Sequence, residues 1–187
     1  MNRQMNRMIK DIYRIHGGGK YMIQEPITQS VHAVQTSIKV KELGGDENMQ
    51  LAGLLHDIGH IIMKPIDPCM GVNDHHEYKA FKWLRYHYFP NEISYPILNH
   101  VEAKRYLCST EWGYYESLSK ASRLSFELQG GFMTNEEKWK FEDKKYFLQS
   151  LLLRKADDQS KDVDIKNIPE FDTLLDDLFV NLRKFNF

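Results

Sequence analysis

Cysteine is scarce in this sequence, which has two among its 187 residues, Cys69 and Cys108, and no Cys-x-x-Cys pair. Such a chain offers no disulfide framework and no thiolate metal site. We interpret both as reduced thiols of a cytoplasmic protein, with Cys108 as core packing. No apolar run approaches the roughly 18 residues of a membrane span, and residues 1–15 lack the apolar core of a secretory signal. The sequence therefore predicts no membrane partner.

An excess of charge of one sign is also missing. Lysine and arginine number 25 against 26 aspartates and glutamates, for a formal net charge of −1, and no long basic run occurs. A protein that binds nucleic acid normally carries a basic patch, so we expect no nucleic-acid partner. A small basic pocket for an anion is still compatible with this composition. The predicted partner is therefore a small molecule.

Patterns typical of β-strands are nearly absent too. Apolar residues recur instead at helical spacing through most of the chain. The length is that of one domain large enough to bury a core. We expect an all-α, single-domain helical bundle over residues 1–187, with its core at about 21–160 and a C-terminal helix, 171–187, packing on it.

Three of the predicted helices carry clear start signals. Pro26 suits the first position of the helix that crosses His32. Asp46 is the expected N-cap of a helix that runs to about Met63. Thr134 and the glutamate three residues later have the spacing of a capping box. These signals separate helical segments along one continuous domain.

The chain does contain histidines and aspartates on several different helical segments. In the stretch LAGLLHDIGH, residues 51–60, a His-Asp pair stands on an apolar helix, where an unpaired buried charge would be costly. Imidazole suits iron, zinc and similar metals, and a carboxylate can bridge two of them. The candidate ligands are His32, His56, Asp57, His76, His100 and Asp157.

Each candidate also has a plainer interpretation. A lone histidine on an apolar helix is more often a hydrogen-bonded core residue than a ligand. By default His76 and His100 would be surface residues, and Asp157, beside another aspartate, would face water. The order of the set, with one histidine, then His-Asp, then two histidines and an aspartate on successive helices, favours a site for two metals.

This ordered set resembles the HD-domain superfamily, in which His, His-Asp and Asp form the core and two further histidines occur in members with two metals. A narrower resemblance covers residues 21–160. Segments such as NHVEAKRYLC and LSKASRLSFELQGG are similar to the mixed-valent di-iron oxygenases of phosphonate catabolism, of which myo-inositol oxygenase is a distant cousin. These strings are longer than His-Asp-Ile-Gly alone, whose four residues are few.

The resemblance implies an oxidoreductase with two iron ions, Fe(II) and Fe(III), and O2 as co-substrate. Such a dioxygenase cleaves the C–P bond of a 1-hydroxyphosphonate of the 2-amino- or 2-trimethylammonio-1-hydroxyethyl type. Its products are a carboxylate, of the glycine or betaine type, and inorganic phosphate. An upstream phosphonate hydroxylase would supply the substrate, and we expect a monomer. One iron would be held by His32, His56, Asp57 and Asp157, and the other by Asp57, His76 and His100.

Two basic side chains are candidates for binding the phosphonate. Lys104 follows His100 by four residues, so on a helix it lies on the same face, close to the metals. His60 follows His56 by four residues in the same way and would donate to the same phosphonate. The alternatives are a solvated surface lysine and a histidine that supports the core by a hydrogen bond.

Four polar residues match further positions of the oxygenase family. Ser122 and Ser125 correspond to hydroxyls that line the phosphonate pocket, although either could be an ordinary helix serine. Gln29 lies three residues before His32, and Arg154 lies three before the last aspartate of the set. Both resemble substrate-binding or supporting residues, and Arg154 has the simpler alternative of pairing with a neighbouring carboxylate.

The entrance to the site departs from the family pattern. The phosphonate oxygenases have a tyrosine and a glutamate three residues apart that form a lid, and the glutamate recognises the substrate amine. Glu25 stands at the expected distance before His32, but Tyr21 precedes it by four residues and Met22 occupies the matching position. The lid and the amine end of the substrate are therefore the open part of the prediction.

Two other classes of function compete with the oxygenase. An HD-type phosphohydrolase would use the same ligands on a nucleotide or another phosphate ester. Metal identity separates the two, because iron favours oxygenation while manganese, zinc or cobalt favours hydrolysis. A non-catalytic binding module would be expected to have lost a ligand, and none is missing from this sequence.

Overall fold

The computed structural model describes residues 3–19, 27–62 and 71–182, with side chains up to residue 180. Within these ranges the chain forms helices and no β-strand, which confirms the all-α prediction. The elements are α1 (Arg3–His16), α2 (Gln29–Glu42), α3 (Glu47–Leu55), the 3-10 helix η1 (Ile58–His60), α4 (His76–Tyr86), α5 (Asn91–Thr110), α6 (Tyr114–Ser117), α7 (Lys120–Leu128), α8 (Asn135–Glu142), α9 (Phe147–Asp158) and α10 (Phe171–Leu182).

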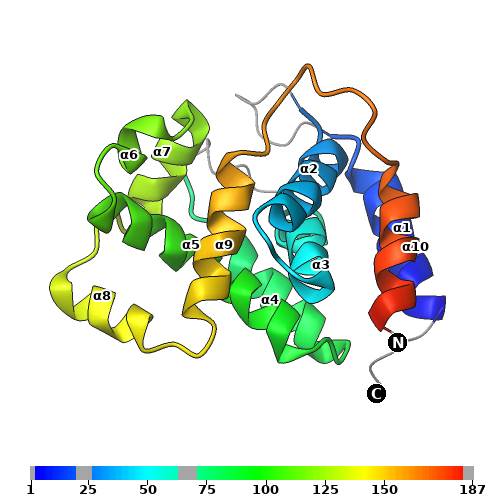
Figure 1. Ribbon diagram of the computed structural model, residues 1–187, viewed down its shortest axis with the longest axis horizontal. Coiled ribbons are helices and arrows are strands. Elements are labelled where there is room, and N and C mark those ends of the chain that lie inside the picture. The colour runs from blue at the N-terminus through cyan, green and yellow to red at the C-terminus, as the bar shows by residue number, and fades with distance from the viewer. Residues whose placement is uncertain (1–2, 20–26, 63–70, 183–187) are drawn as a thin grey trace.

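The helices form a bundle around α3 (Figure 1). Helix α3 packs against α2, α5, α9 and α10, and α9 lies along α5. At one end of the bundle α1 and α10, the first and last helices, contact each other, while α6, α7 and α8 lie at the other end. No helix in the described ranges is both long enough and apolar enough to span a bilayer.

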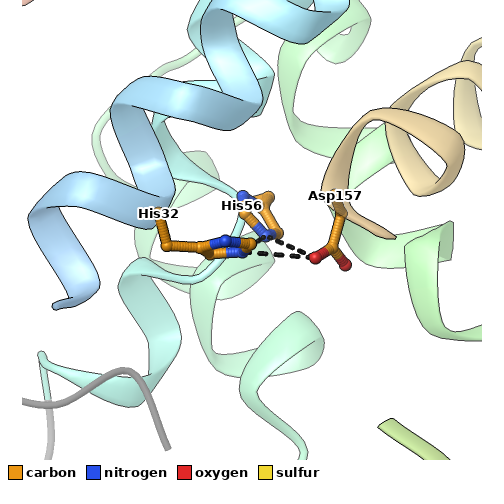
Figure 2. A group of neighbouring side chains, drawn as sticks. All are labelled: His32, His56 and Asp157. Carbon is orange, nitrogen blue, oxygen red and sulfur yellow. Dashed lines mark hydrogen bonds and ion pairs between the residues drawn. The ribbon is translucent and has the colours of Figure 1, made fainter. Parts of the chain in front are cut away.

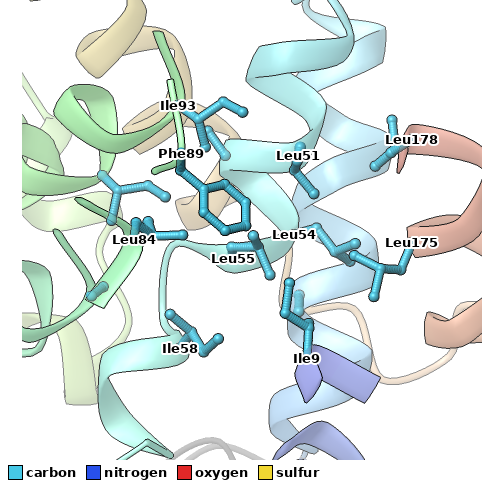
Figure 3. Packing of buried hydrophobic residues seen from close by; sticks show 14 of the residues in the cluster. Ile9, Leu51, Leu54, Leu55, Ile58, Leu84, Phe89, Ile93, Leu175 and Leu178 are labelled. Carbon is cyan, nitrogen blue, oxygen red and sulfur yellow. The ribbon is translucent and has the colours of Figure 1, made fainter. Parts of the chain in front are cut away.

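The hydrophobic core is centred on the second half of α3, residues 51–55, which is apolar and buried on all sides as expected for an enclosed helix. Leu51, Leu54 and Leu55 of this helix are completely buried. Figure 3 shows them between Ile9 of α1 and Leu175 of α10 on one side and the α4–α5 region on the other. The end of α3, which carries the His-Asp pair, is therefore anchored by packing in several directions.

Helix α2 begins later than the proline signal predicts. Pro26 itself lies outside the described residues, and the helix starts at Gln29. Thr28 is the N-cap, because its backbone is extended and its hydroxyl accepts the N–H of Val31. Because the Thr28 hydroxyl accepts a backbone N–H that has no partner within the helix, the first helical turn begins at Gln29.

Two other predicted helix starts are confirmed. Asp46 caps α3, since its carboxylate accepts the backbone N–H of Met49 at 2.9 Å. Thr134 and Glu137 form the capping box at the start of α8, each side chain accepting the backbone N–H of the other. The local signals were sufficient here because both partners lie within one helical turn.

The predicted helix from Asp46 to about Met63 is wrong at its C-terminal half. Helix α3 ends at Leu55, and the chain turns at Asp57, whose backbone angles are φ −100° and ψ 9°, into the short η1. Gly59 of η1 packs directly on α4, where an added Cβ would lie 2.0 Å from the carbonyl oxygen of His76. The break therefore lets η1 approach α4 at a distance that only glycine permits.

Candidate metal centre

Six side chains, four imidazoles and two carboxylates, converge in the interior of the bundle from five parts of the fold. Every one of them is at most 5% exposed. They come from α2, from the turn after α3, and from α4, α5 and α9. They are the predicted ligands His32, His56, Asp57, His76, His100 and Asp157.

The first group within this cluster is formed by His32, His56 and Asp157 (Figure 2). The Nε2 atom of His32 lies 3.3 Å from Nε2 of His56 and 3.2 Å from Oδ1 of Asp157. Nε2 of His56 lies 3.8 Å from the same carboxylate oxygen. Three potential donor atoms thus face a common point.

The second group consists of His76 and His100 together with Asp57. The two Nε2 atoms lie 3.1 Å apart. Oδ1 of Asp57 lies 3.6 Å from Nε2 of His76 and 3.9 Å from Nε2 of His100. These three atoms face a second point on the other side of the carboxylate.

Asp57 lies between the two groups and turns one oxygen toward each. Its Oδ2 is 3.4 Å from Nε2 of His56 and 3.8 Å from Nε2 of His32, whereas its Oδ1 faces the second group. The turn after α3 makes this possible, because it separates the directions of His56 and Asp57. A carboxylate placed in this way has the geometry to bridge two cations.

The four imidazole rings are held by their outer nitrogens. Each Nδ1 lies 2.7–2.9 Å from an oxygen acceptor. The acceptors are the carbonyl of Ser160 for His32, that of Gly53 for His56, that of Ile97 for His100, and the carboxylate of Asp74 for His76. A neutral ring that donates through Nδ1 turns the Nε2 lone pair inward, as in metal-binding histidines.

The inward-facing nitrogen and oxygen atoms are arranged as metal ligands and not as hydrogen-bonded partners of one another. Two Nε2 lone pairs at 3.1–3.3 Å cannot form a hydrogen bond between neutral rings. Oδ2 of Asp57 and Oδ1 of Asp157 are buried and have no hydrogen-bond partner among the described residues. Ligands about 2.0–2.1 Å from a tetrahedral ion lie about 3.3 Å apart, close to the spacings within each group. The residues present therefore suit two metal ions.

The buried histidines and Asp57 shift one another's pKa values. Burial raises the pKa of the Asp57 carboxyl, but the charges of His56 and His60 outweigh it and hold that pKa well below its usual range. Burial lowers the pKa of His56, but Asp57 outweighs this effect and raises it to about 9. Metal ions would replace such protons, because only deprotonated imidazole and carboxylate groups bind metals.

Arg154 supports the centre from behind Asp157. Its Nη1 lies 2.8 Å from Oδ2 of Asp157, and its Nε donates to Oδ2 of Asp158, also at 2.8 Å. The hydroxyl of Tyr114 donates to the same oxygen of Asp158. Arg154 therefore pairs with the neighbouring carboxylates, as the simpler alternative expects, and leaves Oδ1 of Asp157 turned toward the histidines. It also lines the cavity beside the metal ligands, so its predicted contact with the substrate stays a prediction.

A small cavity of about 10 Å³, which has room for about one water molecule, adjoins the second group of ligands. His60, Lys104, Ser122 and Ser125 line it together with Asp57. Lys104 is 2% exposed, so it is not a solvated surface lysine, and its Nζ donates to Oγ of Ser125 at 2.8 Å. Burial, together with the positive charge of Arg154, lowers the pKa of Lys104 to about 7. These groups form a polar, partly cationic wall beside the candidate metals.

The other candidates are less closely connected to this cavity. Gln29 is buried at the start of α2 and is not among the described residues that line it. Tyr21 and Glu25 lie outside the described residues. Cys108 is buried, as predicted, and burial raises the pKa of its thiol to about 11.

Sequence reasoning missed three polar residues of this region. Asp74 contacts two histidines of the site, Gln129 lines the cavity, and Nζ of Lys161 donates to Oγ of Ser122 at 2.7 Å. The only signal for Asp74 was its position two residues before His76. Gln129 and Lys161 stand just beyond the ends of α7 and α9, where polar residues are ordinary.

The fold and this cluster define a helical metalloprotein of the HD type, and sequence comparison agrees. The profile of the HD domain matches residues 30–138, so the chain belongs to the HD-domain family. The match includes five of the six clustered side chains. Asp157 lies beyond it and joins the cluster through α9.

The chain is also related to phosphonate dioxygenases, which confirms the narrower resemblance. It is 37% identical to hydroxymethylphosphonate dioxygenase of Gimesia maris over 154 residues, 81% of this chain and 75% of that protein. It is 33% identical to the glycine-betaine-forming [1-hydroxy-2-(trimethylamino)ethyl]phosphonate dioxygenase of Leisingera caerulea over 80% of this chain and 76% of the relative. An uncharacterized protein of Acanthamoeba polyphaga mimivirus is 36% identical over 86% of this chain and 77% of its own length.

Proposed function

We propose that this protein is a di-iron oxygenase that uses O2 to cleave the C–P bond of a 1-hydroxyphosphonate, giving a carboxylate and inorganic phosphate. The observation that carries the proposal is the position of Asp57. Its two oxygens face two separate groups of inward-turned imidazoles, beside a cavity with a buried lysine. The names of two relatives supply the reaction type.

The first iron would be held by the group of His32, His56 and Asp157, and the second by the group of His76 and His100, with Asp57 shared. As a Fe(II)/Fe(III) pair, the two ions would supply redox chemistry toward O2. The protein supplies rigid placement, since the Nδ1 contacts fix the rings and Arg154 fixes Asp157. Burial of the whole cluster excludes bulk water.

The cavity residues would bind the phosphonate end of the substrate. The ammonium of Lys104 and the hydroxyls of Ser122 and Ser125 are donors on one wall, and His60 lies on the wall nearest Asp57. Phosphonate oxygens accept hydrogen bonds and carry negative charge, so they are matched by these groups. Holding that end fixed would place the hydroxyl-bearing carbon beside the second metal position.

The two relatives with named substrates differ at the other end of the substrate. Hydroxymethylphosphonate has no second carbon, whereas the trimethylamino compound has one with a cationic group. We infer that the 1-hydroxyphosphonate unit is what this site recognises. Whether the protein prefers an amine, a methylated amine or no amine would depend on Glu25 and Tyr21 in our prediction. We further propose a cytoplasmic monomer that acts after a phosphonate hydroxylase.

The test is a stoichiometric assay of protein reconstituted with iron without air. Oxygen uptake and phosphate release would be measured together for hydroxymethylphosphonate, 2-amino-1-hydroxyethylphosphonate and its trimethylammonium analogue. We expect one phosphate for each O2 consumed with at least one of these compounds. Hydrolysis of a phosphate ester without oxygen uptake would overturn the proposal in favour of an HD-type phosphohydrolase.

A further inference from the structure

Asp74 is a buried carboxylate that the proposed function does not use. It lies two residues before His76, between η1 and α4, and is 3% exposed. Its Oδ1 is 2.9 Å from Nδ1 of His76 and also accepts the backbone N–H of that residue at 3.3 Å. Its Oδ2 is 2.7 Å from Nδ1 of His60. One carboxylate therefore faces the outer nitrogens of two different histidines.

The contact with His76 is a hydrogen bond, and the contact with His60 pairs an imidazole nitrogen closely with a carboxylate oxygen. The same three side chains are also close enough together to be taken for a third metal site. The backbone N–H of His76 also points at the carboxylate, and a donor would repel a cation there. Asp74 thus acts as an acceptor for the two rings.

The two rings are arranged alike. His60 and His76 stack with their centroids 4.0 Å apart and their planes inclined by 20°. Because both turn Nδ1 toward Asp74, both turn Nε2 the opposite way, toward Oδ1 of Asp57 at 3.8 and 3.6 Å. A ring rotation at either histidine would exchange the carboxylate contact for a poorer one.

We propose that Asp74 is a positioning residue that fixes, through one carboxylate, both the metal-facing nitrogen of His76 and the cavity-facing nitrogen of His60. The roles of these two histidines rest on the proposed function, whereas their orientation by Asp74 does not. The carboxylate links the second metal position to the phosphonate-binding wall, because one of its oxygens contacts His76 and the other contacts His60.

Asp74→Ala removes this carboxylate from both rings, and the other carboxylate near Nδ1 of His76, that of Glu77, is 3.7 Å away. In metal-free, ¹⁵N-labelled protein, at a pH high enough to keep the rings neutral, we expect the ring nitrogen signals of His60 and His76 to change to mixed tautomers. The signals of His32, His56 and His100 should stay as they are, since backbone carbonyls hold those rings. Unchanged signals for His60 and His76 would overturn the proposal.

A titration with Co²⁺, followed by its visible spectrum, tests the consequence for the metals. In Asp74→Ala we expect the first equivalent to bind as in the wild type and the second to bind about 10- to 100-fold more weakly, the usual effect of losing a partner of a ligating histidine. Equal loss of both equivalents would indicate a merely structural role and contradict the proposal. A wild type that binds fewer than two ions would instead refute the proposed function, and the ring signals would still decide the role of Asp74.

Two further variants complete the test. Asp74→Asn keeps an oxygen for His76, where the backbone N–H also binds it, but presents an NH2 group to His60. We therefore expect a tautomer switch at His60 alone, with both Co²⁺ equivalents retained. Asp46→Ala is the matched control, because Asp46 also accepts a backbone N–H but lies at the start of α3. It should leave the ring signals and the second equivalent unchanged.

Discussion

Arg154 and Asp157 lie one turn apart on α9, and the guanidinium group of Arg154 binds the side of the Asp157 carboxylate that faces away from the histidines. Arg154 also binds Asp158, so two carboxylates in or near the interior share one buried cation. Burial lowers the pKa of Arg154, but the two aspartates outweigh it and hold that pKa well above its ordinary value.

Replacing Arg154 by methionine should destabilise the protein strongly. The change keeps the aliphatic length but leaves two carboxylates without their cation, and breaking a buried ion pair in this way costs about 3–5 kcal/mol. The free energy of unfolding would be measured in urea. Lys155→Met is the matched control, since its pair with Glu111 is exposed and should be worth about 1 kcal/mol or less. Equal losses for the two variants would contradict the buried pairing.

Substitution of His76 should lower the metal content of the protein, whereas substitution of its neighbour His75 should not. His76→Asn removes a candidate ligand of the second group, so we expect bound iron to fall from two ions to one per chain. His75→Asn should keep both, because the His75 side chain is exposed and its left-handed backbone, φ 51°, tolerates asparagine. Elemental analysis of the reconstituted proteins measures the ratio. Retention of two ions by His76→Asn would remove that residue from the ligand set.

Gly59→Ala should disrupt the contact between η1 and α4. The new methyl group would lie 2.0 Å from the carbonyl oxygen of His76, so the two backbones must separate. Overpacking of this kind typically costs about 1–3 kcal/mol, and we expect the upper end because the obstacle is backbone. Gly18→Ala is the control, with nothing within 4 Å of the added atom. Thermal unfolding of the two variants measures the difference, and a stable Gly59→Ala protein would contradict the close approach.

The stability of the metal-free protein should depend on pH through Lys104. Burial, with Arg154 adding to it, lowers the pKa of Lys104 to about 7 in the fold, whereas an unfolded chain keeps lysine near about 10.4. At a pH between these two pKa values, Lys104 is protonated in the unfolded chain but not in the folded one. Its contribution to the free energy of unfolding therefore increases as pH rises.

Lys104→Met abolishes this contribution. The stability of the wild type relative to the variant should therefore increase by about 3 kcal/mol between about pH 7 and about pH 9.5, at 1.36 kcal/mol per unit of pKa difference. Urea midpoints of both metal-free proteins at the two pH values give the comparison. A constant difference over that range would mean that the Lys104 ammonium stays charged inside the protein.

Features that depend on residues close together in the sequence could be predicted, and features that depend on residues far apart could not. Helix starts at Asp46 and Thr134 depend on partners three residues away and were predictable. The end of α3 was not, because it depends on Gly59 meeting the backbone of α4, a contact that exists only in the folded chain.

In the candidate site, too, some residues could be predicted from the sequence and others could not. Residue types and their order gave the six clustered side chains, since metal ligands come from a short list of amino acids. Asp74 was not predictable, because its contact with His60 depends on how η1 packs beside α4. The burial of Lys104 was equally hidden, as helical spacing places it near His100 but says nothing of the α7 serines that enclose it.

The outer nitrogens of the four clustered imidazoles are anchored by the protein itself, and this has a consequence for how the centre acquires its metals. Sites of nitrogen and oxygen donors bind Cu²⁺ and Zn²⁺ more tightly than Fe²⁺, so the ion that such a site holds depends on the geometry that the anchored rings impose and on which metals are available. In the proposed di-iron enzyme, iron occupancy would then reflect which ion is abundant while the chain folds. Protein made in a zinc-rich medium would carry an ion without redox chemistry, although every residue of the site was in place.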